Sequence, residues 1–170
     1  GALKVITTTG ALESPSGVGG RAVFVDYALL DPGVHGTKAQ EWYREGAYKP
    51  YSTEEAVNRI AEVKTMIPPW VRVMRVQRDI PAPLIAAGVD KSNLRQCVQQ
   101  NLAERGLRCV CIRCREVGHR MTLDNVKPDL GKADIVTISY EASAGREIFI
   151  SAETPEDSAL VGYLRLRIPS

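Results

Sequence analysis

Three cysteines and one histidine lie within eleven consecutive positions of this 170-residue chain, as Cys109, Cys111, Cys114 and His119. Three thiolates and one imidazole complete a tetrahedral zinc shell and leave no position open for water, so a zinc ion held here is structural. Thiolates also favour zinc over magnesium or calcium. Because such sites contribute folding energy, we predict one structural Zn²⁺ held by these four residues.

Other interpretations of this cluster stay open on the sequence alone. The spacing C-x-C-x₂-C-x₄-H differs from a standard zinc ribbon, and reduced structural thiols are one alternative. A disulfide between Cys109 and Cys111 is strained, and one that includes Cys97 is disfavoured in a reducing compartment. Catalysis by one cysteine with His119 lacks a recognisable nucleophile motif. We interpret Cys97, on the apolar side of a predicted helix, as a small core residue.

The rest of the chain predicts a mixed α/β fold. Ser52 and Glu55 form a capping box that opens a helix, and Pro68-Pro69 end it. Two more helices are predicted, over 38–44 with its end at Gly46 and over 92–105 with its end at Gly106. Strand patterns cover 22–30, 70–76, 135–143, 147–153 and 159–168.

The connections complete this organisation. Residues 79–91 are predicted as a loop and residues 121–133 as a polar linker, from their proline and glycine content. Short polar connections join the last three predicted strands and indicate an antiparallel meander. The glycine-rich stretch before residue 21 is expected to be flexible, and it lacks the Gly-Lys-Ser/Thr ending of a phosphate-binding loop.

Composition excludes several classes. A length of 170 residues fits one domain or two small ones, and 44% hydrophobic with 25% charged residues is typical of globular proteins. No run of about 18 apolar residues is present, so no transmembrane helix is expected. The N-terminal GALKVITTTG is a poor signal peptide. We therefore expect a cytoplasmic protein without a membrane partner.

Basic residues are concentrated in the middle of the chain. The net charge is only +2, but residues 72–120 hold ten basic and four acidic side chains, which is +6 and leaves −4 for the remainder. Such a pattern indicates nucleic-acid binding through phosphates, and a solvated arginine-rich surface is the alternative. The candidate binding residues are Arg72, Arg75, Arg78, Lys91, Arg95, Arg113 and Arg115.

Several long motifs extend through this region and beyond it. They are GAYKPYSTEE, IPPWVRVMRVQRDIPAPLIAAGVDKSNLRQ, CVCIRCREVGH, ISYEASAGREIFISAE and VGYLRLRIPS. Together they resemble the Elongator catalytic subunit family, which are tRNA uridine acetyltransferases, also called tRNA carboxymethyluridine synthases. The resemblance covers roughly residues 36–170, and its cysteine set is that of the prokaryotic type.

This resemblance implies a function and a domain layout. Family members combine a radical-SAM domain with a GNAT-type acetyltransferase domain and modify C5 of the wobble uridine of tRNA with acetyl-CoA. It implies the end of a radical-SAM-like domain over 21–105, a zinc-binding linker over 106–133 and the first GNAT strands over 134–170. The glycine-rich composition predicts a flexible segment 1–20 before them. The implied partners are tRNA and the remainder of the same enzyme.

Two family motifs do not occur in this sequence. The three-cysteine [4Fe–4S] motif and the glycine-rich acetyl-CoA loop are both missing. The family's [4Fe–4S] cluster, S-adenosylmethionine and acetyl-CoA are therefore expected in the parent enzyme, and the chain, a fragment of that enzyme, is expected to be inactive alone, with no catalytic residue of its own. The alternative is a stand-alone zinc-stabilised RNA-binding module.

Overall fold

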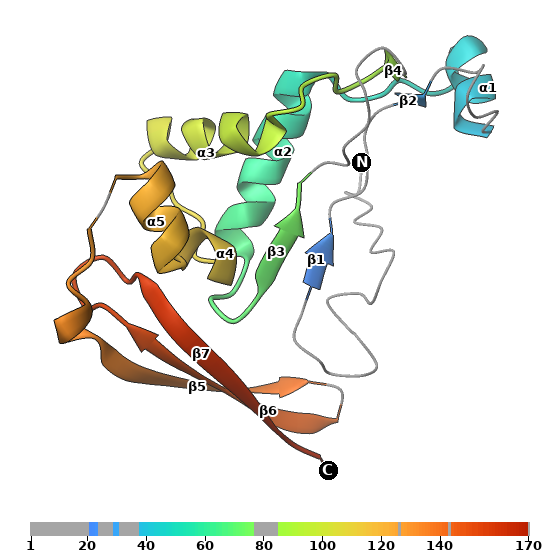
Figure 1. Ribbon diagram of the computed structural model, residues 1–170. Helices are drawn as coiled ribbons and strands as arrows, with labels where there is room; N and C mark the ends of the chain where they lie inside the picture. The colour runs from blue at the N-terminus through green and yellow to red at the C-terminus, as the bar shows by residue number, and fades with distance from the viewer. Residues whose placement is uncertain are drawn as a thin grey trace. The chain divides into compact units, whose positions relative to one another are not determined.

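The computed structural model describes residues 21–23, 29–30, 38–76, 85–125, 127–142 and 144–169. Helices and strands alternate along it, which confirms the mixed α/β class (Figure 1). Two compact units are formed, and each is described by itself. Unit 1 comprises 1–5, 24–66 and 75–108, and unit 2 comprises 6–23, 67–74 and 109–170. Within the described ranges, no helix is long and apolar enough to cross a membrane.

The main helix of unit 1, α2 (Thr53–Met66), begins at the predicted capping box. The Ser52 N–H donates to Glu55 Oε2 at 2.8 Å, and the Glu55 N–H donates to the Ser52 hydroxyl at 3.2 Å. The bond from the Ser52 N–H lowers the pKa of Glu55 below its usual value, because it favours the charged carboxylate. The helix ends just before Pro68-Pro69, as predicted.

The second helix of unit 1, α3 (Leu94–Glu104), packs against α2. Leu94, Val98 and Leu102 are buried at helical spacing, as predicted, and Asn101 Nδ2 donates to Asn58 Oδ1 of α2 at 3.0 Å. Cys97 is only half-buried, so its assignment to the core was wrong. Its position on α3 lies beside the buried stripe and not within it.

The shorter elements of unit 1 are partly as predicted. Helix α1 (Lys38–Arg44) has the predicted bounds, and Gly46 and Gly106 follow their helices with φ of 74° and 64°. Such left-handed backbone is accessible to glycine without strain and ends a helix.

The single strand predicted over 22–30 was wrong. Two short strands occur there, β1 (Arg21–Val23) and β2 (Leu29–Leu30), and the residues between them lie outside the described part of the chain. β1 pairs with β3 (Arg72–Arg75), which falls in the predicted strand 70–76. β2 pairs antiparallel with β4 (Ile85–Ala87), inside the stretch predicted as a loop. The two ends of the apolar run 22–30 therefore form separate short strands, because each end pairs with a different strand.

Unit 2 contains the predicted meander. Strands β5 (Asp134–Ala142), β6 (Gly145–Glu153) and β7 (Leu160–Ile168) form an antiparallel sheet in that order (Figure 1). Before them come two short helices, α4 (Ile112–Arg115) and α5 (Val117–Leu123), and the 3₁₀ turn η2 (Leu130–Lys132). The predicted linker 121–133 therefore begins inside a helix.

One face of this sheet forms the core of unit 2. Phe149 of β6 is fully buried and packs in a cluster with Ile112 and Leu160. Trp70 packs against this cluster and stacks on Tyr140, with ring centroids 4.5 Å apart and an angle of 13° between the planes. The segment before β3 is thereby attached to the sheet.

Gly145 begins β6 at a point where its backbone closely approaches β7. A Cβ at this position would lie 2.9 Å from the Ile168 carbonyl oxygen, so one strand must shift. We expect Gly145→Ala to lower the free energy of unfolding by about 1–3 kcal/mol through overpacking. Gly162→Ala in β7 is the matched control, because nothing lies within 4 Å of its added Cβ. Urea denaturation of both variants measures the difference, and equal stabilities would contradict the prediction.

A candidate metal centre and the basic residues around it

Short-range hydrogen bonds determine the backbone conformation of residues 109–115, here called the cysteine loop. Cys111 is the residue before α4 and has extended backbone, with φ of −61° and ψ of 157°. Its carbonyl accepts from the N–H groups of Cys114 at 3.1 Å and Arg115 at 3.2 Å. The Ile112 N–H donates to the Val71 carbonyl at 2.9 Å, which attaches the start of α4 to the chain just before β3. One helical turn therefore returns Cys114 toward Cys111.

The three thiols of this loop converge. The sulfur atoms of Cys109, Cys111 and Cys114 all lie within 4.8 Å of one another, and the first two residues are buried. Tetrahedral zinc with Zn–S bonds of about 2.3 Å separates its sulfurs by roughly 3.8 Å, so the loop needs only a small contraction to bind one ion. No disulfide joins any of the four cysteines. Convergent thiols therefore fit a single thiophilic ion.

The predicted fourth ligand, His119, lies on α5 outside this trio. The group of potential ligands found in the described ranges contains the three cysteines alone. His119 Nε2 lies 3.6 Å from Glu116 Oε2. A metal-bound imidazole commonly keeps a carboxylate partner on its other nitrogen, so this contact is compatible with coordination through Nδ1. The role of His119 as a ligand stays a prediction.

Glu116 is also the partner of Arg72. Both carboxylate oxygens accept from this guanidinium, from Nη2 at 3.0 Å and from Nη1 at a shorter distance. The hydrogen bond to Glu116 raises the pKa of Arg72 above its usual value, because it stabilises the charged form. Arg72 is thus held by a bidentate pair that links β3 to the residue between α4 and α5.

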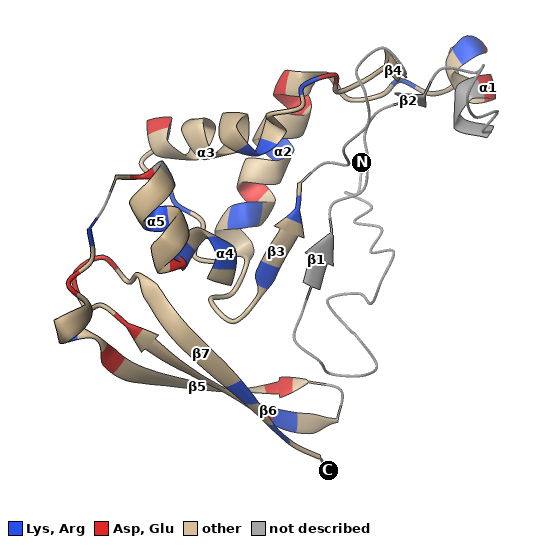
Figure 2. Cartoon of the chain, viewed as in Figure 1, with Lys and Arg blue, Asp and Glu red and all other residues tan. Residues whose placement is uncertain are grey.

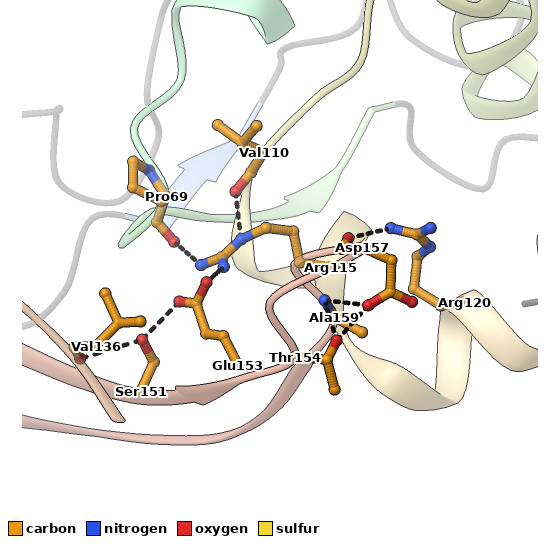
Figure 3. Close-up of polar contacts among 10 residues, drawn as sticks. All are labelled: Pro69, Val110, Arg115, Arg120, Val136, Ser151, Glu153, Thr154, Asp157 and Ala159. Carbon is orange, nitrogen blue, oxygen red and sulfur yellow. Dashed lines mark hydrogen bonds and ion pairs between the residues drawn. The ribbon is translucent and has the colours of Figure 1, made fainter. Parts of the chain in front are cut away.

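The charged guanidinium of Arg115 is buried within unit 2 (Figure 3). Its Nε donates to the Val110 carbonyl at 2.9 Å and one Nη donates to the Pro69 carbonyl at 3.0 Å. The other Nη lies 2.5 Å from Glu153 Oε2, and the Arg115 side chain is only 7% exposed. All three nitrogens of the guanidinium are therefore engaged within the protein.

The other predicted phosphate-binding residues differ in exposure. Arg75 and Lys91 are exposed, Arg95 and Arg113 are half-buried, and Arg78 lies outside the described residues. Figure 2 shows basic and acidic residues interspersed along the helices and strands. Both units contribute, since Arg75, Arg78, Lys91 and Arg95 belong to unit 1 and the other three to unit 2.

Sequence reasoning did not single out the carboxylates of β6. Glu147 is 1% exposed, accepts from the Tyr140 hydroxyl at 2.8 Å and pairs with Arg167 at 3.1 Å and Arg165 at 3.6 Å. Glu153 pairs with Arg115, as described. Strand periodicity gave a signal, because both glutamates share the face of Phe149 in EIFISAE.

Comparisons with known proteins agree with the resemblance seen in the motifs. Residues 34–104 match the Radical_SAM C-terminal domain. Over 136 residues the chain is 46% identical to the tRNA uridine(34) acetyltransferase of Methanocaldococcus jannaschii, covering 80% of this chain and 25% of that protein. Over 134 residues it is 40% identical to Elongator complex protein 3 of Dictyostelium discoideum, covering 79% and 24%.

A solved structure is also similar. The archaeal Methanocaldococcus infernus Elp3 with an N-terminal deletion aligns with a TM-score of 0.78 and 42% identity, over 88% of this chain and 34% of that one. The chain is therefore homologous to radical-SAM proteins. Within them it is a relative of the Elongator catalytic subunits, which confirms the family indicated by its motifs. It spans about a quarter of the length of these curated relatives.

Proposed function

We propose that this chain supplies a structural metal site and part of the tRNA-binding surface of a tRNA uridine(34) acetyltransferase. The observation that carries the proposal is the convergence of three thiols in a chain 46% identical to a relative of that name. The parent reaction is acetyl-CoA-dependent modification of the wobble uridine at C5, in the cytoplasm. The domain layout implied by the family remains part of this proposal.

We propose zinc as the metal, held by Cys109, Cys111 and Cys114 with His119 as the fourth ligand. Three soft thiolates select against magnesium and calcium, and a closed four-ligand shell makes the ion structural. Metal analysis of the reduced, purified chain tests this, with about one zinc per chain as the expected result. A metal content near zero after reconstitution with zinc under reducing conditions contradicts it.

The other cofactors of the parent enzyme are not assigned to this chain in our proposal. An iron–sulfur cluster with S-adenosylmethionine supplies radical chemistry, and acetyl-CoA supplies the acyl group. We assign none of these three to residues of this chain, and we propose no catalytic residue in it. The chain's contribution is to hold the metal loop and to bind the tRNA backbone.

For tRNA binding, exposure ranks the six basic candidates that the structure describes. Arg75 and Lys91 are exposed and accessible to phosphate, whereas Arg72 and Arg115 form ion pairs within unit 2. Phosphate contacts position RNA without reading its sequence, and each contact releases counterions. We therefore propose that Arg75 and Lys91 make the strongest phosphate contacts, and Arg78, three positions after Arg75 in the sequence, stays a candidate from the sequence alone.

The salt dependence of tRNA binding tests this assignment. Reversing the charge of Arg75, Arg78 and Lys91 together is expected to weaken binding and to reduce the logarithmic salt slope by roughly two to three. The matched control reverses the charge of three exposed basic residues outside residues 72–120, so that the net charge changes by the same amount. These residues are Lys127, Lys132 and Arg146. Equal slopes for the two triple variants would show that only total charge matters.

A further inference from the structure

We propose that Arg115 is the positioning residue of the three-cysteine site, and that Glu153 at the end of β6 fixes Arg115 in place. The inference rests on the metal site proposed above. Arg115 acts through the backbone between two of the ligands, because it donates to the carbonyl of the residue that separates them.

Val110 is the residue between the first two cysteines. Its carbonyl oxygen accepts from Arg115 Nε at 2.9 Å. Because a peptide unit is planar, holding this oxygen fixes the plane that joins Val110 to Cys111. The donor, Arg115, directly follows Cys114 on α4. One guanidinium therefore connects the extended part of the loop, with Cys109 and Cys111, to the helical part with Cys114.

A second anchor holds the guanidinium from the other side. Glu153 Oε2 lies 2.5 Å from one Nη, and Glu153 Oε1 accepts from the Ser151 hydroxyl at 2.6 Å (Figure 3). Both Arg115 and Glu153 are largely withdrawn from water, with side chains 7% and 13% exposed. Paired buried charges keep one geometry, since separating them leaves each charge uncompensated.

The requirement is for arginine and not only for positive charge. The guanidinium presents donors in a rigid fork, and here three separate acceptors use it: Val110, Pro69 and Glu153. A lysine ammonium at the same position retains the charge opposite Glu153 but has no planar fork to hold the carbonyls. Groups that orient metal ligands in this way are typically worth about 10- to 100-fold in metal affinity.

The experiment measures zinc affinity by competition with a chromophoric chelator, and ligand geometry from the visible spectrum of bound Co²⁺. Arg115→Lys and Glu153→Gln are each expected to weaken zinc binding by about 10- to 100-fold. The double variant should be little worse than either single one, because both changes remove the same support. Arg146→Lys is the matched control, since Arg146 is exposed and lies at the opposite end of β6. It should bind zinc as the parent chain does.

A metal-free measurement separates this inference from the proposed metal site. In the reduced chain with excess chelator, alkylation of Cys109 and Cys111 is followed residue by residue by mass spectrometry. These buried thiols should react at least about tenfold faster in Arg115→Lys than in the parent chain or in Arg146→Lys, because opening of the loop exposes them. Circular dichroism verifies that the β-sheet is retained, and Glu153→Gln provides a second variant should Arg115→Lys unfold.

Each outcome decides one question. If the parent chain binds no zinc but the thiols become reactive in Arg115→Lys, the metal site is wrong and the positioning role stands. If Arg115→Lys binds zinc as tightly as Arg146→Lys and its thiols stay protected, the positioning role is overturned. Full retention of affinity in Arg115→Lys with loss in Glu153→Gln also overturns it, because charge alone would then suffice.

Discussion

Replacing Glu147 with alanine is expected to lower the free energy of unfolding by about 3–5 kcal/mol. This carboxylate is buried between Arg165 and Arg167, and Arg165 is itself only 17% exposed. Removing one partner of a buried pair leaves an uncompensated charge in the interior, which is more destabilising than the loss of the contact itself. Arg165 also donates to the Trp70 carbonyl and lies over the Phe149 ring, so the disturbance reaches the core of unit 2.

Urea denaturation provides the measurement, with Glu141→Ala as the control. Glu141 is an exposed residue of β5, and removal of its carboxylate is expected to change stability by less than about 0.5 kcal/mol. A Glu147→Ala chain as stable as this control would mean that Arg165 and Arg167 find water or other acceptors, and the prediction would fail.

Tyrosine ionisation gives a second test of Glu147→Ala. Burial, and then the hydrogen bond donated to Glu147, raise the pKa of Tyr140 from 10.0 to about 12. A raised phenol pKa means that folding favours the protonated form. Its stabilisation is therefore complete below the unfolded pKa and is lost as the pH rises from about 10 through 12. In Glu147→Ala the pKa of Tyr140 should fall, while the part due to burial persists.

Replacing Cys111 with serine is expected to abolish stoichiometric zinc binding. Cys111 is fully buried, lies at the start of α4 and provides one of the three convergent sulfurs. Serine is a poor ligand for a thiophilic ion, and binding energy is folding energy in such sites. The stabilisation by zinc, about 4 kcal/mol at a free concentration 1,000 times Kd, should disappear with the site.

Thermal melting with and without chelator measures this effect. The parent chain should melt at a lower temperature when chelator is added, and the Cys111→Ser chain should melt at the same temperature in both conditions. Cys97→Ser is the control, because Cys97 is a half-buried thiol of α3 outside the cluster, and it should retain the response to chelator. Zinc retained at about one per chain in Cys111→Ser would remove Cys111 from the ligand set.

Local signals predicted a large part of this fold. The capping box of α2, the proline pair after it and the meander of β5, β6 and β7 are all determined by neighbouring residues, and all were confirmed. By contrast, β1, β2 and β4 are very short strands, and their existence depends on pairing partners far along the chain. Periodicity over so few residues carries little information.

In the candidate site, too, the sequence predicts the features that depend on neighbouring residues and misses those that depend on distant partners. The cysteine spacing alone indicates a metal loop, because the ligands lie close together in the sequence. The ion pairs of Arg72 with Glu116 and of Arg115 with Glu153 join residues about forty positions apart. Counting charges along the sequence assigned both arginines to a phosphate-binding stretch. Such a count gives the sign and density of charge, but it does not show which carboxylate the fold places beside each guanidinium.

Unit 2 is discontinuous in sequence, and this determines how the chain can be dissected. Its segments 6–23, 67–74 and 109–170 are separated by residues 24–66 and 75–108, which belong to unit 1. A fragment that started at Cys109 would lose the Pro69 carbonyl that Arg115 binds, the Trp70 ring that stacks on Tyr140 and the Arg72 partner of Glu116. No single cleavage point therefore yields both units whole, and excising unit 2 requires short linkers in place of residues 24–66 and 75–108.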